Sequence, residues 1–227
     1  MEEVEEWDEE LESQLKELFS ETDESKTHLI NRLNSIFAKI SKGMQQLIIL
    51  LPQLTEIVDH VEQKSITCAM GKMIAIASML TQEHSLALTS LYEGRSLQEI
   101  FELSEETMDA LYQLARHIYD QQHYEEASGA FCLLALINPA YTTFWHGLGN
   151  SEYCLGNYQE ALLAYTFALQ TDADNMTTHM LIVRTHIALG NRAQAQTALQ
   201  MAAYTDRNSA FQEQLQRLKN DIIRTFL

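Results

Sequence analysis

The chain has 227 residues, enough for one or two domains with a hydrophobic core, and carries a net charge of −17. Such an acidic chain repels phosphate backbones, so nucleic-acid binding is not expected. Eight glycines and two prolines are few for this length, which favours an all-helical protein with short turns. The N-terminus is acidic where a signal peptide would be basic, and the most apolar stretch, 66–80, is too short to span a bilayer. We therefore expect a cytoplasmic protein without stable membrane insertion.

Residues 1–26 form an acidic segment with an apolar stripe. Residues 1–25 hold twelve acidic side chains and one basic side chain, a net charge of −11. Six apolar side chains recur at steps of three or four residues or lie next to one another: Val4, Trp7, Leu11, Leu15, Leu18 and Phe19. This pattern predicts an amphipathic helix that needs a partner surface. A solvated tail that keeps the protein soluble is the alternative interpretation.

Residues 27–95 are predicted to form an N-terminal helical region. Apolar residues follow a helical period from Leu29 to Leu51, and Pro52 then ends or bends the helix. A later run, from Ile66 to about Tyr92, is apolar nearly all round its helix near the methionines. Such a helix must be buried in its own domain or against another chain. The second option makes this region a candidate homodimer interface.

Local capping signals mark the third region, residues 96–227. Ser96 and Glu99 have the spacing of a capping box for a short helix, and Ser104 is placed to cap the helix that follows. Leu103 and Met108 are spaced as a hydrophobic staple around that cap. A helical array is therefore expected to begin at Ser104.

One pattern occurs twice between Met108 and Asn175, at a spacing of 34 residues. The corresponding residues are Leu111 and Trp145, Ala115 and Gly149, Tyr124 and Tyr158, and Phe131 and Tyr165. A weaker third copy extends to Ala202. The period, with W-x2-L-G and A-x3-F/Y, is the signature of the tetratricopeptide repeat, whose helix pairs stack because one hairpin cannot bury its apolar face alone. The predicted fold is all-α: three such repeats and a C-terminal capping helix, after the N-terminal helical region.

The predicted hairpins follow from these repeats. Their helices are expected at 105–121 and 124–138, at 142–155 and 158–171, and at 176–189 and 192–204. Gly156 and Gly190 fall in turns. A last helix from about Ser209 has one apolar face and one polar face, as a terminal capping helix requires.

A peptide groove is the candidate functional site. In the repeat family, certain positions of the first helix of each pair face the inner curve of the stack. Here they are Tyr112, Arg116, Tyr119, His146, Asn150, Tyr153, Met180, Arg184 and Ile187. This mixed lining suits an extended peptide, because apolar anchors fill pockets while polar groups hold the peptide backbone. The alternative is that Tyr112 and Tyr119 merely pack against residues 96–103 or a neighbouring helix.

The sequence predicts neither a metal site nor a catalytic nucleophile. The three cysteines lie in apolar helical patterns without metal spacing, and we interpret them as reduced core residues: Cys68, Cys132 and Cys154. His179 and His186 are seven residues apart, which does not place two imidazoles around one ion as an i, i+4 pair does. No G-x-S-x-G motif, phosphate loop or catalytic carboxylate pair occurs. We predict neither an enzyme nor a cofactor.

Several strings carry a more specific resemblance. S-L-Q-E-I at 96–100, L-S-E-E at 103–106, F-W-H-G-L-G at 144–149 and L-G-N-Y-Q-E-A at 155–161 are similar to the class II type III secretion chaperones, the SycD/LcrH/IpgC family. The resemblance covers about residues 95 to 205. It implies a bacterial cytosolic chaperone that grips an extended N-terminal segment, of the P-x-L-x-x-P type, of a hydrophobic translocator protein.

The resemblance also implies which residues bind that segment. Carried over to this chain, they are Tyr112, Arg116, Tyr119, His146, Asn150 and Tyr153. Arg116 departs from the apolar or aromatic residue expected there, and the region before the repeats is longer than is usual in the family. A long region of this kind resembles chlamydial members, whose substrates include a gatekeeper as well as translocators. The alternative function is a tetratricopeptide scaffold or regulator in a stable protein complex.

Overall fold

The structure is a computed structural model, and it describes residue 42 and residues 96–100, 102–207 and 209–226. The predictions for residues 1–26 and 27–95 therefore lie outside the described residues. Every regular element within the described ranges is a helix. The helices are α5 (Leu97–Ile100), α6 (Glu105–Asp120), α7 (Tyr124–Ile137), α8 (Thr142–Cys154), α9 (Tyr158–Thr171), α10 (Met176–Ala188), α11 (Arg192–Thr205) and α12 (Gln212–Phe226).

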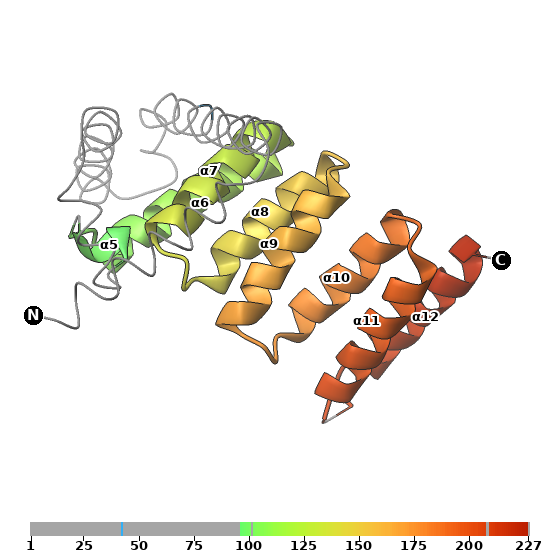
Figure 1. The fold of residues 1–227 in the computed structure, drawn as a ribbon. Coiled ribbons are helices and arrows are strands. Elements are labelled where there is room, and N and C mark those ends of the chain that lie inside the picture. The colour runs from blue at the N-terminus through green and yellow to red at the C-terminus, as the bar shows by residue number, and fades with distance from the viewer. Residues whose placement is uncertain (1–41, 43–95, 101, 208, 227) are drawn as a thin grey trace, which may run out of the picture. The chain divides into compact units, whose positions relative to one another are not determined.

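Three helical hairpins follow one another from α6 to α11, and α12 closes the C-terminal end (Figure 1). The all-α prediction of three repeats and a capping helix is confirmed, and each hairpin helix lies within one residue of its predicted bounds. The capping helix begins later than predicted, at Gln212. Ser209 has a φ of 57°, outside the helical region, and the Asp206 carboxylate accepts the N–H groups of Ala210 and Phe211 at 2.9 and 3.0 Å.

The predicted caps are present. The Ser96 N–H donates to Glu99 Oε2 at 2.8 Å, and the Glu99 N–H donates back to Ser96 Oγ at 3.2 Å, which is a capping box. The Thr107 N–H donates to Ser104 Oγ at 3.2 Å and so caps α6. The two predicted staple residues on either side of this cap are both buried in one core cluster. Local chemistry thus fixes where the array begins.

Two apolar cores hold the array together. The first lies among α5 to α8 and includes Met108, Leu111, Leu114, Phe131 and Phe144. The second consists of two adjoining clusters, which both contact Met180 and Leu199, and it joins α10 and α11 to α12, whose Leu215, Leu218 and Ile222 are buried. Gly156 and Gly190 turn the chain between the helices of the second and third hairpins, with φ of 82° and 75°.

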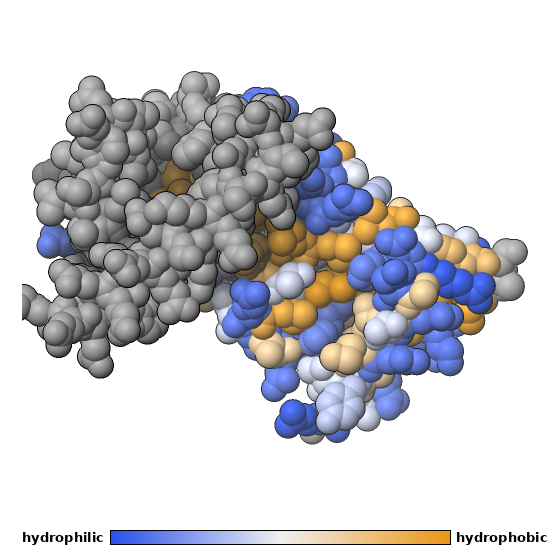
Figure 2. Space-filling model, viewed as in Figure 1, coloured by the Kyte–Doolittle hydropathy of each residue, from blue (hydrophilic) through white to orange (hydrophobic). Residues whose placement is uncertain are grey.

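The surface of the array is mixed in character. Figure 2 shows apolar side chains gathered over the middle of the described part, bordered by hydrophilic ones. The exposed large apolar residues are Leu136, Leu155, Leu163, Phe167, Met201, Tyr204 and Ile223. Among the helices of the described residues, none is both long and apolar enough to cross a membrane.

Candidate peptide-binding site

The first helices of two neighbouring hairpins, α6 and α8, border a cleft of about 360 Å³. We call it the tyrosine cleft, and its lining residues are Tyr112, Arg116, Tyr119, Asp120, Phe131, Thr143, His146, Gly147 and Asn150. Five of the nine residues predicted to face a ligand are among them. The two helices place these side chains together because the predicted positions recur on one face of each helix.

Tyr112 forms part of the floor of the cleft. Its ring is half-buried, and the ring centroids of Phe131 and Phe144 each lie 6.0 Å from its own centroid. Tyr112 therefore packs against neighbouring helices, as the alternative interpretation held, and it lines the cleft as well. An aromatic ring that already packs against two other rings is a rigid apolar contact for a ligand, since little side-chain entropy remains to be lost.

Tyr119 and Tyr153 occupy the same position in successive repeats, and each packs against the tyrosine that begins the next helix. The Tyr119 ring meets Tyr124 edge-on with centroids 5.3 Å apart, and the Tyr153 ring meets Tyr158 edge-on at 5.1 Å. Both rings are half-buried. Burial is the main cause that raises the pKa of the Tyr119 hydroxyl, and its contact with Cys154 Sγ at 3.5 Å adds to the effect. The hydroxyl is therefore protonated at neutral pH and can donate to a ligand carbonyl.

Asn150 brings an amide to the cleft in a fixed orientation. The Tyr165 hydroxyl donates to Asn150 Oδ1 at 2.8 Å, and burial keeps the pKa of Tyr165 well above its ordinary value. A protonated hydroxyl can make this bond at any physiological pH. Because the amide oxygen is already engaged, the amide N–H₂ is the group that Asn150 offers to a ligand.

The third hairpin places its predicted site residues differently. Met180 and Ile187 are half-buried and pack against the second core, which α12 covers. Arg184 is exposed, and its Cζ lies 5.7 Å from the centroid of the Tyr153 ring. The structure thus brings Arg184 to Tyr153 but places Met180 and Ile187 in packing contacts at the C-terminal end of the array.

His146 joins the cleft to the third hairpin. Its Nε2 lies 2.6 Å from Thr178 Oγ1 on α10. Burial lowers the pKa of His146, and the charge of Asp172 opposes that shift only in part. The imidazole is therefore neutral at pH 7. Burial lowers the pKa of His186 for the same reason.

These two histidines predict a pH dependence of stability. A lowered folded pKa means that the unfolded chain takes up the proton more readily, near the ordinary histidine pKa of about 6.5. The free energy of unfolding should therefore be constant above about pH 6.5 and should fall as the pH drops below it. Urea midpoints at about pH 7.5 and about pH 5.5 measure this decline, and His146→Gln is expected to reduce it. The control is His123→Gln, because His123 is exposed. If His123→Gln reduced the decline in stability as much as His146→Gln, the decline could not be attributed to the buried histidine.

Glu152 is a buried residue that the sequence analysis did not single out. It is 1% exposed, and its carboxylate accepts hydrogen bonds from Ser128 Oγ on α7 and from Asn157 Nδ2, the latter at 2.8 Å. The sequence did contain a signal that this position is buried. In the first repeat the same position holds Ile118, which is fully buried. An acidic residue at a core position of a repeat predicts a buried polar network.

Cys154 corrects one prediction. The interpretation of the cysteines as core residues is wrong for Cys154, which is exposed at the last turn of α8, while Cys132 is half-buried. The apolar pattern of α8 ends before this turn, so the thiol lies beyond the core. Cys68 lies outside the described residues. Within the described residues, no three His, Cys, Asp or Glu side chains gather as metal ligands would.

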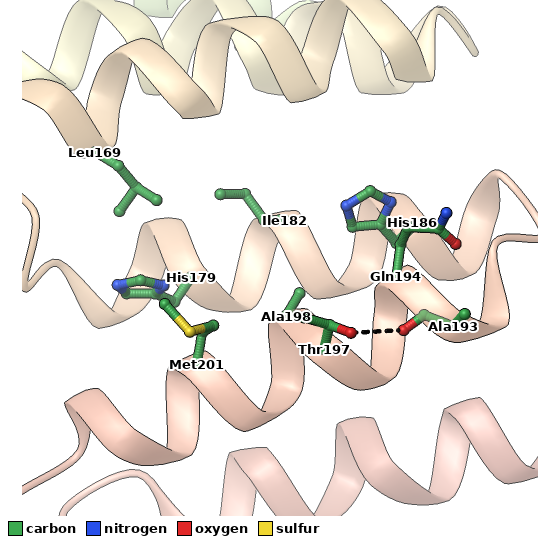
Figure 3. A pocket seen from close by; sticks show the side chains of 9 residues that line it. All are labelled: Leu169, His179, Ile182, His186, Ala193, Gln194, Thr197, Ala198 and Met201. Atoms are coloured by element: carbon green, nitrogen blue, oxygen red, sulfur yellow. Dashed lines mark hydrogen bonds between the residues drawn. The ribbon is translucent and has the colours of Figure 1, made fainter.

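A second cavity, of about 430 Å³, lies among α9, α10 and α11 (Figure 3). In the repeat register, its His179 and Thr197 correspond to the larger Trp145 and Leu163 of the preceding hairpin. The Trp145 ring stacks on Phe167 with centroids 4.7 Å apart, and its Nε1 donates to the Pro139 carbonyl at 2.7 Å. The smaller side chains between the second and third hairpins thus leave a cavity, whereas the larger side chains at the corresponding positions between the first and second hairpins fill that space.

Comparison with known proteins relates this geometry to a class of proteins. The tetratricopeptide repeat family model matches residues 155–222. Low calcium response locus protein H of Yersinia pestis is 28% identical over 123 residues, which are 54% of this chain and 73% of that protein. The type III secretion translocator chaperone SycD of Yersinia enterocolitica superposes with a TM-score of 0.53 and 24% identity, over 57% of this chain and 98% of SycD.

A further structure is of SycD from the same organism in complex with a peptide of the translocator YopD. It has a TM-score of 0.50 and 25% identity, over 55% of this chain and 95% of that chain. The aligned share corresponds in size to the repeat array together with its capping helix. The chain is therefore homologous to the low calcium response locus protein and has the tetratricopeptide fold of the class II type III secretion translocator chaperones.

Proposed function

We propose that this protein is a type III secretion chaperone that binds an extended segment of a hydrophobic translocator or gatekeeper protein in the tyrosine cleft. The observation that carries the proposal is the cleft itself, where the half-buried rings of Tyr112 and Tyr119 stand beside the amide of Asn150. Tyr153 continues this surface one repeat further along the stack. The structure of the related SycD in complex with a peptide of the translocator YopD supports a peptide as the ligand.

The proposed mechanism is physical and needs neither a cofactor nor a reaction. Aromatic anchors in the cleft cover apolar side chains of the bound segment and prevent their pairing elsewhere. Ordering an extended segment costs conformational entropy, so binding is moderate in affinity and reversible at the export machine. We place this activity in the bacterial cytoplasm. The long region before the repeats supports a member of the chlamydial type, for which a gatekeeper is a second class of client.

Co-expression with a translocator that is insoluble alone tests the proposal. The wild-type chain is expected to keep the translocator soluble, and Tyr119→Ala combined with Tyr153→Ala should abolish the rescue. Loss of two aromatic anchors of about 1.5 kcal/mol each would weaken binding on the order of 100-fold. Tyr204→Ala is the matched control, since Tyr204 is 82% exposed on α11. Circular dichroism verifies that each variant is folded.

Two outcomes would count against the proposal. Full rescue by the double variant would mean that the cleft is not the binding surface. A partner that is soluble and stable without this protein would favour a scaffold within a complex instead of a chaperone.

A further inference from the structure

Three polar side chains recur at one position of the repeat. Arg116 on α6, Asn150 on α8 and Arg184 on α10 are spaced by 34 residues each. Arg116 and Asn150 line the tyrosine cleft together. Arg184 stands over the Tyr153 ring, one hairpin further along. Each repeat therefore presents one hydrogen-bond donor at this position, and Asn150 and Arg184 lie beside Tyr165 and Tyr153 of the second repeat.

These donors have few partners within the part of the chain that the structure describes. The Arg116 side chain is 61% exposed, and its Nε lies 3.8 Å from Asp120 Oδ2. An exposed pair at this distance contributes little and exchanges readily for a two-point contact with another carboxylate. Among the described residues, Arg184 makes a cation–π contact and no hydrogen bond from its guanidinium. The Asn150 oxygen accepts from the Tyr165 hydroxyl, and its amide N–H₂ has no hydrogen-bond partner among the residues that the structure describes.

The three donors form one connected strip. Tyr165 links two of them. Its hydroxyl donates a hydrogen bond to Asn150. Burial raises the pKa of Tyr165, and the positive charge of Arg184 partly offsets that rise. The Arg184 guanidinium also lies over the ring of Tyr153 on α8, the helix that carries Asn150, with its Cζ 5.7 Å from the ring centroid. Asn150 is also within the cleft that Arg116 lines. A peptide crossing the cleft would meet guanidinium, amide and guanidinium in that order.

An acidic ligand at this strip is affected mainly by the charged groups that lie beside it. Residues 96–175, which carry the tyrosine cleft, hold twelve acidic side chains and one basic side chain, a net charge of −11, whereas residues 176–227 hold six basic and three acidic side chains, a net charge of +3. Exposed charges farther apart than about 8 Å are largely screened at physiological salt. The groups beside the ligand therefore decide. They are Arg116 and Arg184, together with Asp120, which lines the cleft, and Asp172, whose charge acts on His146.

We propose that the segment bound in the tyrosine cleft carries acidic side chains beside its apolar anchors, and that Arg116 and Arg184 each bind one of their carboxylates. Asn150 donates to the peptide backbone between them. Arginine is suited to this task, because its planar guanidinium meets a carboxylate at two points. This inference rests on the proposed function and names the chemistry of its ligand: an extended segment that is both apolar and acidic.

Two fluorescein-labelled peptides of equal length and of the P-x-L-x-x-P type test the inference on the full chain. One has glutamate at the variable positions and the other has glutamine, and fluorescence anisotropy gives both dissociation constants. The glutamate peptide is expected to bind about tenfold more tightly to the wild-type chain. Arg116→Gln and Arg184→Gln should each weaken its binding about fivefold and leave the glutamine peptide unchanged.

Arg217→Gln is the matched control. Arg217 lies on α12, pairs with Glu213 at 2.7 Å as an i, i+4 pair, and carries the same charge away from the cleft. It should change neither affinity. Equal affinity of the two peptides for the wild-type chain would overturn the acidic preference and leave the proposed function standing. If Arg217→Gln weakened binding of the glutamate peptide as much as the two cleft substitutions do, the preference would also be overturned, because the net charge of the protein would then be its cause. Binding of neither peptide would overturn the proposed function and this inference with it.

Discussion

Gly149→Ala is expected to lower the free energy of unfolding of the array by about 2 kcal/mol. A Cβ at residue 149 would lie 2.4 Å from Tyr165 Cε1 and 2.7 Å from Cδ1, far closer than van der Waals contact. The Tyr165 ring is fully buried and its hydroxyl is bonded to Asn150, so the ring cannot move aside without losing that bond. Overpacking of this kind costs about 3 kcal/mol at the upper end, and the better helix propensity of alanine returns about 1 kcal/mol.

The midpoint of urea unfolding measures this effect, and a second background isolates its cause. In a Tyr165→Leu chain the ring is absent, so the same Gly149→Ala change should be neutral or slightly stabilising. Equal destabilisation in both backgrounds would contradict the steric explanation. Because Tyr165 orients the Asn150 amide, Gly149→Ala should also weaken peptide binding at temperatures where the array remains folded.

The helical frame of the array could be predicted because its determinants are local. Ser104 caps α6 through its own hydroxyl, and Gly156 and Gly190 turn the chain at φ angles that favour glycine. Between such signals the apolar period gave the bounds of the six hairpin helices within one residue, whereas α12 begins three residues later than predicted. A residue's neighbours three or four positions away are enough to decide whether it is helical.

The site could be predicted only in part, because positions taken from a repeat family assume that a further repeat follows. That assumption holds for Tyr112 and Tyr119, since α8 lies beside α6 and together they border the cleft. The third hairpin is followed instead by α12, and there Met180 and Ile187 pack into the core that Leu218 and Ile222 complete. The end of the stack thus changes the environment of residues whose repeat position is the same.

Glu152 shows a different limit of sequence reasoning. Its charge indicates an exposed residue, whereas its repeat position indicates a buried one. Glu152 is buried, because Ser128 from α7 and Asn157 from the turn after α8 donate hydrogen bonds to its carboxylate. Those donors are distant or unremarkable in the sequence, so the network becomes evident only when the helices are placed side by side.

Glu152→Ala is expected to destabilise the array by about 3 kcal/mol, because it leaves the buried Ser128 hydroxyl and the Asn157 amide without their common acceptor and opens a cavity. Glu152→Gln retains the volume and one acceptor oxygen, so a smaller loss of about 1 to 2 kcal/mol is expected. Urea unfolding of the three chains measures both steps. The exposed Glu160 on α9 provides the control, since Glu160→Ala removes the same group from the surface and should change stability by less than about 0.5 kcal/mol.

The same substitution also connects stability to binding. Glu152 anchors α8 to α7 from inside, and α8 carries both His146 and Asn150 into the tyrosine cleft. If the network sets the position of α8, Glu152→Gln should weaken binding of the glutamate and glutamine peptides by the same factor, because it displaces the whole cleft wall. An unchanged affinity together with reduced stability would restrict Glu152 to a structural role. Stability of Glu152→Ala equal to that of the wild-type chain would mean that the buried carboxylate network contributes nothing to the fold.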